Sequence, residues 1–306
     1  MNLTVINYHY FRETTYPDGI FPTSVNKLIQ DVDFISKKFV FISQNELNDY
    51  FSGKGRLNYN LKKKYCLLTW DDGLSEQMEA FDILQNIGVP ALFFVNTKPY
   101  FDNKLLDVHK LHIVRSLIPD KKIIELLKAN YNFDQYKFNK NLLEIQYRYD
   151  NQDAKQLKYF LNFVLNKEDK EEVINIFFKE CIDSEEEFCK KFYMSNDDLV
   201  KLSLNDSLGS HGHSHHPIGK MSLEDGINDI NSSIQYLELI TKKRIISFAY
   251  PYGSPDAIGD KTSLLFDNTS IRFIFNMTRG QNIINTFSKC CELKRFDNND
   301  INTLDV

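Results

Sequence analysis

The chain has 306 residues, of which 42% are hydrophobic and 26% are charged, and its formal net charge is −5. This composition is typical of a globular protein with a large core, and the charge balance argues against nucleic-acid binding. No window approaches the roughly 20 apolar residues that a membrane span requires, and the N-terminus does not resemble a signal peptide. The five scattered cysteines form neither a disulfide framework nor a zinc ribbon. We therefore expect a cytoplasmic protein with reduced thiols and no membrane span.

The first hundred residues predict strands that alternate with helices. Short joints between such elements indicate βαβ units, and therefore a parallel sheet or a barrel. Thr23 or Ser24 can cap the first helix, and Ser75 can cap the second. The expected strands are 3–8, 39–42, 65–70 and 91–95, and the expected helices are 25–35 and 78–87.

Residues 97–205 have a different pattern. Strand signals vanish, and charged helical segments follow at 123–127, 157–165, 171–181 and 185–192. We interpret 97–205 as a helical insertion or subdomain that could shape substrate access or allow the chain to form a homo-oligomer. The βα pattern resumes at 206 with a long helix capped by Ser222 and strands at 245–250 and 271–275. Residues 1–96 and 206–306 would then form one barrel.

The strand predicted at 65–70 ends in two adjacent carboxylates, Asp71 and Asp72, followed by Gly73. Its apolar residues do not alternate with polar ones, which is typical of a strand covered on both faces. Two neighbouring acids repel each other unless a positive charge, such as a divalent metal, lies beside them. One aspartate could bind a metal while the other remains free as a base. An ordinary Asp-Asp-Gly turn is the alternative.

Four of the seven histidines fall within residues 211–216. His211 and His215 have a spacing compatible with metal binding, and Gly212 and Pro217 indicate a loop after a short strand at 207–210. Imidazoles suit zinc, iron or cobalt. An accidental histidine-rich loop is the alternative. Two histidines and one aspartate nevertheless make a three-ligand site with coordination positions open for water or substrate.

These residues resemble motifs of the polysaccharide deacetylase family, which contains the NodB homology domain (carbohydrate esterase family four). Thr69-Trp70-Asp71-Asp72-Gly73 is similar to the family's Thr-Phe-Asp-Asp-Gly motif, and His211 and His215 are similar to its paired histidines. Phe248-Ala249-Tyr250-Pro251-Tyr252-Gly253 is similar to its Arg-x-Pro-Tyr-Gly motif. The resemblance covers about residues 1–96 and 206–306. It implies an α/β fold, specifically a distorted (β/α)7 barrel, with the large helical insertion lying outside the resemblance.

The resemblance also implies roles for individual residues. Asp71 would be the general base, and Asp72, His211 and His215 would bind a divalent metal. The metal would most readily be Zn²⁺, with Co²⁺, Fe²⁺ or Ni²⁺ as alternatives. The backbone N–H of Tyr252 would help to hold the oxyanion.

Three departures from the family pattern bear on these roles. Ala249 stands where the third motif has the arginine that orients the base, and Arg279 or Arg295 could replace it from another strand end. Gly212 follows the first histidine, where the family has Ser or Thr. Arg295 stands where the late Leu-x-His motif supplies the general acid, and arginine cannot give up a proton at neutral pH.

The proton for the leaving amine must then come from another group. The candidates are His213, His216, a water molecule on the metal and Asp71 after it has taken the first proton. His109 and His112 are further candidates if the insertion folds over the site, although ordinary packing or surface histidines are the favoured interpretation of both. Residues 8–10, with His9 at their centre, would lie on the same barrel rim as the motifs, either as a substrate wall or as packing.

Two functions are therefore open. The first is a metal-dependent hydrolase that removes an acetyl or formyl group from an amino sugar, with an intracellular precursor or intermediate of surface polysaccharide as substrate. The second is a catalytically inactive barrel that binds glycans. The missing arginine and histidine favour the second function, whereas the intact Asp71-Asp72 and His211–His215 pairs favour the enzyme.

Overall fold

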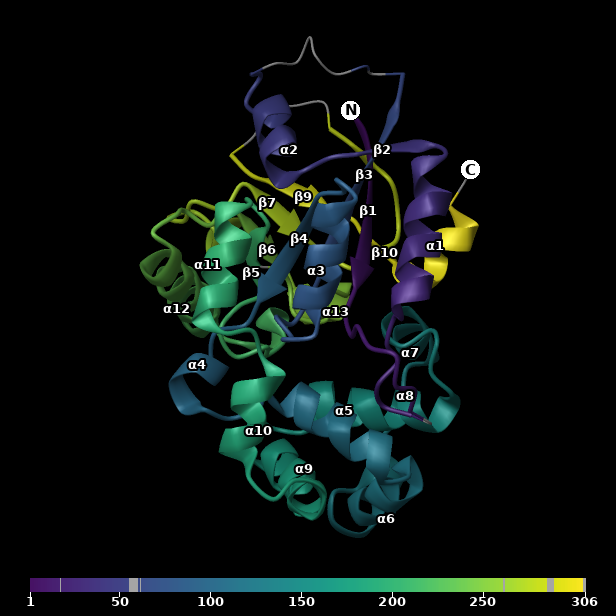
Figure 1. Ribbon diagram of the computed structural model, residues 1–306. Helices are drawn as coiled ribbons and strands as arrows, with labels where there is room; N and C mark the ends of the chain where they lie inside the picture. The colour runs from purple at the N-terminus through teal and green to yellow at the C-terminus, as the bar shows by residue number, and fades with distance from the viewer. Residues whose placement is uncertain (17, 55–59, 61, 261, 285–288, 305–306) are drawn as a thin grey trace. The chain divides into compact units, whose positions relative to one another are not determined.

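The computed structural model describes residues 1–16, 18–54, 60, 62–260, 262–284 and 289–304 (Figure 1). Spatial contacts divide the chain into two compact units. We call one the barrel unit (Met1–Glu13, Pro22–Phe101 and Lys190–Val306) and the other the helical unit (Thr14–Phe21 and Asp102–Cys189). The domain boundaries expected from the sequence, at 97 and 205, stay a prediction.

The barrel unit is built on one sheet in which the strands along the main path are all parallel. In spatial order the path runs β10-β1-β3-β4-β5-β6-β7-β9. Off this path, β2 pairs with β3, and β8 pairs antiparallel with β1. In chain order the strands are β1 (Asn2–Tyr8), β2 (Phe39–Phe41), β3 (Lys64–Trp70), β4 (Ala91–Val95), β5 (Leu208–Ser210), β6 (Ser247–Ala249), β7 (Phe273–Phe275), β8 (Asn282–Ile283), β9 (Cys291–Leu293) and β10 (Phe296–Asp297).

The two ends of this path meet through the chain itself. Only Lys294 and Arg295 separate β9, at one end, from β10, at the other. The eight strands of the path therefore nearly close into a barrel, and Arg295 lies at the point of closure. The α/β barrel predicted from the sequence is confirmed.

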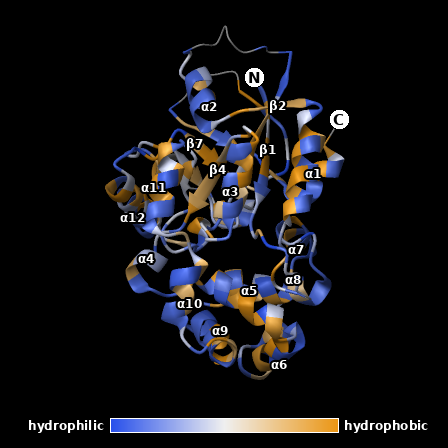
Figure 2. Ribbon diagram, in the orientation of Figure 1, coloured by the Kyte–Doolittle hydropathy of each residue, from blue (hydrophilic) through white to orange (hydrophobic). Residues whose placement is uncertain are grey.

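Alternate residues of the strands enter two different hydrophobic clusters, which explains why the strand sequences show no polar alternation. One cluster packs the strands against α1 (Val25–Ser36), α3 (Gln77–Asn86), α11 (Asn196–Leu204) and α12 (Leu223–Thr241), and the other fills the inside of the barrel. The first includes Ile6, Leu68, Trp70, Phe93 and Phe248, and the second includes Val5, Leu67, Phe94, Ala249 and Phe275. Figure 2 shows these strands as mainly hydrophobic and the covering helices as mixed.

The helix starts test the predicted caps. The Ser24 side chain accepts from the N–H of Lys27 at the start of α1, and Ser222 accepts from Asp225 at the start of α12, so both predictions are confirmed. The prediction for Ser75 is wrong. Helix α3 begins after Glu76, one position later than a Ser75 cap requires, and it has no side-chain cap; the Ser75 hydroxyl donates to the carbonyl of Lys191 instead.

Helix α2 (Gln44–Phe51) of the barrel unit was not predicted, although Ser43 and Glu46 form a capping box at its start. Shorter helical segments also occur in this unit. They are α4 (Pro99–Asp102), α13 (Pro255–Ile258), α14 (Thr262–Leu265) and the 3₁₀ helices η4 (Ile218–Lys220) and η5 (Asn298–Thr303).

The helical unit contains no strand among its described residues. Its helices are α5 (Asp107–Leu117), α6 (Asp120–Asn130), α7 (Lys140–Gln146), α8 (Gln152–Tyr159) and α9 (Lys167–Cys181), and α10 (Glu185–Phe192) begins in it. The four predicted helical segments are confirmed; 157–165 corresponds to the end of α8 and the π-helix η3 (Phe160–Val164) that follows it. The buried guanidinium of Arg115 on α5 binds both carboxylate oxygens of Asp120 at 2.7 and 2.8 Å. None of the described helices, in either unit, has the length and hydrophobicity to cross a membrane.

Candidate active site

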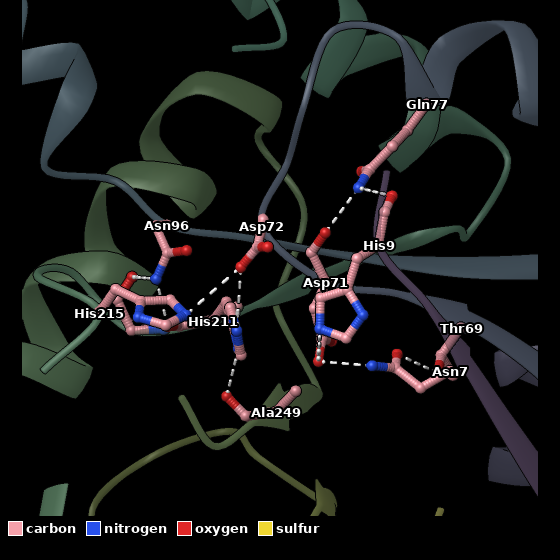
Figure 3. Close-up of polar contacts among 12 residues, drawn as sticks. Asn7, His9, Thr69, Asp71, Asp72, Gln77, Asn96, His211, His215 and Ala249 are labelled. Atoms are coloured by element: carbon pink, nitrogen blue, oxygen red, sulfur yellow. Dashed lines mark hydrogen bonds and ion pairs between the residues drawn. The ribbon is translucent and has the colours of Figure 1, made fainter. Parts of the chain in front are cut away.

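The three predicted metal ligands lie together at the carboxyl ends of two strands (Figure 3). Asp72 follows β3, and His211 and His215 lie on the loop after β5. The Nε2 atoms of His211 and His215 are 3.6 and 3.3 Å from Oδ1 of Asp72. One ligand atom from each residue lies within 4.8 Å of the others, and all three residues are buried. Residues more than a hundred positions apart thus form one compact donor set.

This donor set fits a divalent metal ion. Zinc bonds of about 2.1 Å in tetrahedral geometry place neighbouring ligand atoms about 3.4 Å apart, close to the two separations measured from Asp72. Nδ1 of His211 lies 2.8 Å from the carbonyl oxygen of Ala249. If Nδ1–H donates there, Nε2 keeps its lone pair for a cation. Burial lowers the pKa of His211 to about 4, which keeps this imidazole in the neutral form that metals bind.

The backbone at this cluster is held in an uncommon conformation. Asp72, His215 and Tyr252 have φ values of 84°, 58° and 62°, in the left-handed region that residues with side chains seldom occupy. Such strain persists only where the surrounding structure enforces it, and it concentrates at functional sites. The Tyr252 ring lies 4.9 Å, centroid to centroid, from the ring of His215. The Pro-Tyr-Gly turn therefore lies beside the candidate metal ligands.

A second cluster surrounds Asp71, which points inside the barrel. Nη1 and Nη2 of Arg295 bind its two carboxylate oxygens at 2.7 and 2.8 Å, and Nδ2 of Asn7 donates to it at 2.9 Å. Oδ1 of Asn7 accepts from the Thr69 hydroxyl and from Arg295. We call Asn7, Thr69, Asp71 and Arg295 the base cluster, and Asp72, His211 and His215 the metal-ligand cluster.

The base cluster controls the ionisation of Asp71. Burial by itself would raise the pKa of this carboxyl, but the charge of Arg295, the nearby His211 and His9, and the hydrogen bonds from Arg295 together outweigh burial and hold the pKa below the ordinary value. Asp71 is thus an ionised carboxylate at neutral pH, as a general base must be. Arg295 itself is fully buried at the barrel closure.

The two arginines predicted as alternatives differ in position. Arg295 contacts Asp71 directly, as described above. Arg279 instead forms an ion pair with Asp300 at 3.5 Å and a hydrogen bond with Thr303, and its guanidinium lies over the ring of Phe296. Among the described residues, Arg295 forms the ion pair with Asp71, and the His9 imidazole lies 4.0 Å from the same carboxylate.

The sequence analysis placed His9 on the barrel rim but did not consider it as a proton donor. It follows β1, its side chain is 40% exposed, and its Nε2 lies 4.0 Å from Oδ2 of Asp71. The side chain of Gln77 fixes the two segments, because its Nε2 donates to the carbonyl oxygens of His9 at 2.9 Å and Asp71 at 2.6 Å (Figure 3). The sequence feature that could have pointed to His9 is its position directly after a strand, on the same barrel rim as the motifs.

The other histidines considered as acids have different surroundings. Nδ1 of His213 lies 3.0 Å from the Thr97 hydroxyl, and its ring packs edge-on against Phe101. The backbone N–H of His216 donates to the Ser214 hydroxyl. His109 and His112 lie on α5 of the helical unit, where His109 is fully buried. Any proton transfer by these four residues stays a prediction.

Together, the barrel and the two clusters define a class of protein, an α/β barrel with a three-ligand candidate metal centre beside an ionised carboxylate. A family model described as polysaccharide deacetylase matches residues 185–266, which include both histidine ligands and the Pro-Tyr-Gly turn. A search of curated proteins found no match. The match to the family model confirms the resemblance to the polysaccharide deacetylase family.

Solved structures show the same fold. A de-N-acetylase from Aggregatibacter actinomycetemcomitans is 14% identical with a TM-score of 0.57, and the match covers 97% of this chain and 96% of that one. Streptococcus pyogenes deacetylase PplD, solved with acetate, is 15% identical with a TM-score of 0.51, covering 97% and 92%. A polysaccharide deacetylase from Bacillus cereus is 13% identical with a TM-score of 0.54, covering 97% of this chain but 65% of that chain.

Proposed function

We propose that this protein is a metal-dependent hydrolase that removes an acetyl or formyl group from the nitrogen of an amino sugar within a glycan or glycan precursor. The observation that carries the proposal is the convergence of Asp72, His211 and His215, with the ionised Asp71 next to them in the chain. The family resemblance supports the substrate class. Zn²⁺ is the ion we expect, because two imidazoles, one carboxylate and open positions are typical of catalytic zinc.

The residues of the two clusters have distinct tasks in this proposal. Asp72, His211 and His215 would hold a divalent ion, which would supply polarisation of the acyl carbonyl and activation of water. Asp71 accepts the proton of the attacking water, and Arg295 and Asn7 hold its carboxylate in place. The backbone N–H of Tyr252 stabilises the negative charge that develops on the carbonyl oxygen.

His9 completes the proposed mechanism as general acid. When the C–N bond breaks, the amine needs a proton, and histidine is the residue that most often supplies one. His9 is partly exposed, so substrate can reach it, and it lies beside the base. We propose that His9 does the work that the family's late histidine motif would do, while Arg295, at the place of that motif, holds Asp71 instead.

The test is release of acetate or formate from a panel of N-acetyl and N-formyl amino sugars, as monomers and as oligomers, by protein loaded with Zn²⁺. Asp71→Asn should lower the rate of acyl release by at least about 100-fold, while zinc remains bound. Asp82→Asn, an exposed aspartate that pairs with Lys201, is the matched control and should release acyl groups normally. Unchanged turnover by Asp71→Asn would eliminate the assignment of the base. Zinc and glycan binding without any turnover would favour the glycan-binding barrel.

A further inference from the structure

The loop that carries both histidine ligands is attached to helix α12 by one carboxylate. Asp229 accepts the backbone N–H of His213 at 2.7 Å on Oδ1 and that of Ser214 at 2.9 Å on Oδ2. These two amides lie between His211 and His215 in the chain. Asp229 is only 8% exposed, and it forms no ion pair with any residue that the structure describes. Its charge is therefore balanced locally by the loop amides, and no cationic side chain takes part.

Gly212 is shaped to this carboxylate. Its φ is +77°, and a Cβ at this position would lie 2.8 Å from Oδ1 of Asp229, which is closer than nonbonded atoms approach. The Ser or Thr that the family resemblance leads one to expect after the first histidine would meet the same obstruction. The glycine is therefore explained by the contact that Asp229 makes with the following residues.

The opposite side of the loop is bound to the chain after β4. The N–H of Lys98 donates to the carbonyl of His213 at 3.0 Å, and the N–H of Thr97 donates to that of Gly212 at 3.3 Å. The loop carbonyls are thus held from one element and the loop amides from another. Between these attachments and the end of the loop, His215 takes its left-handed conformation and reaches Asp72.

We propose that Asp229 is a positioning residue for cation binding. It holds the amides between the two histidine ligands, so that His215 is presented to the metal before the metal arrives. This inference rests on the metal centre of the proposed function. Partners that orient the ligands of a metal typically contribute about 10- to 100-fold to metal affinity.

The experiment measures zinc affinity of the full chain by competition with a chromophoric chelator, which requires no turnover. Asp229→Asn keeps the size of the side chain but removes its charge, and it turns an NH₂ group toward a backbone N–H. We expect zinc affinity to fall by about 10- to 100-fold. Glu224→Gln removes the same charge from an exposed position on α12 and should bind zinc like the wild type. Thermal unfolding without metal reports whether each variant is folded.

Gly212→Ala is the second variant, because it perturbs the same contact from the loop side and leaves the carboxylate in place. It should also weaken zinc binding, and the losses in the double variant Gly212→Ala/Asp229→Asn should be less than additive. Zinc affinity unchanged in Asp229→Asn and Gly212→Ala, in a wild type that binds zinc, would overturn the role of Asp229. A wild type that binds no zinc would instead overturn the metal centre itself.

Discussion

The metal-ligand cluster and the base cluster stand on adjacent residues, Asp72 and Asp71, but the chain holds them in different ways. The metal-ligand cluster lies on turns, and much of its support comes from backbone groups, namely the carbonyl of Ala249 and the loop amides held by Asp229. The base cluster lies inside the barrel and is held by side chains that bind one another.

We infer that the two kinds of support serve different purposes, cation binding in one cluster and control of the ionisation of Asp71 in the other. Backbone support leaves the ligand side chains directed at one another, so that a cation can bind between them. Side-chain support saturates Asp71 with donors, which lowers its pKa and fixes its direction. Substitutions in the two clusters should therefore separate in two measurements, metal affinity and the pH dependence of turnover.

The largest effect is expected for His211→Ala. It removes one of three ligands, so zinc affinity should collapse. Losing the several kcal/mol that a catalytic metal contributes should lower kcat/KM by roughly 1,000-fold or more. Chelator competition and acyl release measure the two quantities. Asp71→Asn, from the other cluster, serves as the contrast, because it should lose turnover and keep zinc. If both variants kept zinc equally well, the comparison of the clusters would fail.

The next largest effect is expected for His9→Gln, which should lower kcat/KM for an N-acyl amino sugar by about 100-fold. An aryl acetate should be affected far less, because a phenolate can leave without a proton. Zinc affinity should not change. His213→Gln is the informative comparison, since His213 is the competing acid on the ligand loop. If it lost amide turnover selectively while His9→Gln did not, the role of general acid would pass to His213.

The two clusters also differ in how far the sequence predicts them. The candidate metal ligands come from short motifs whose internal spacing is visible in the chain, and the strand before Asp71 is marked by its unbroken apolar run. The contact of Arg295 with Asp71 joins residues 224 positions apart. It depends on the closure of the barrel by β9 and β10, which are too short to leave a periodic signal.

Other individual residues also show how far the sequence predicts the structure. Ser75 has the residue type of a cap, but the helix begins one residue later, after Glu76, and the Ser75 hydroxyl donates to a carbonyl that the fold brings near. His9 could be placed on the active rim from the sequence, but its distance from Asp71 could not. The helix α2 carried a readable capping box and should have been predicted. Local chemistry is thus readable, whereas pairings between strand ends require the closed barrel.

A moderate effect is expected for Arg295→Met. The pKa of Asp71 is now held low by Arg295, against burial, so turnover is lost only as the pH falls through that low value. Without the guanidinium, the largest influence that lowers this pKa is lost, the pKa rises, and the acid limb of kcat/KM should move to higher pH. Misplacement of the base should also lower kcat/KM at neutral pH by about 10-fold.

The measurement for Arg295 is the pH profile of kcat/KM, taken alongside zinc affinity, which should remain near the wild-type value. Arg295→Lys keeps a positive charge but not the two parallel hydrogen bonds, so its acid limb should move less. Acid limbs that coincide in wild type, Arg295→Met and Arg295→Lys would show that this contact does not control the ionisation of the base.

The smallest effect is expected for Arg279→Met. The sequence offered this arginine as an equal alternative to Arg295, but its side chain is 41% exposed and contacts Asp300 and Thr303. A partly exposed ion pair contributes up to about 1 kcal/mol to stability, so a shift of a few degrees in the melting temperature is the most we expect. The kcat/KM and the zinc affinity should stay within about twofold of the wild type, and the acid limb should not move. Substitutions on the surface away from a site usually have small effects. A displaced acid limb in this variant would place Arg279 in the base cluster and weaken the distinction between the two arginines.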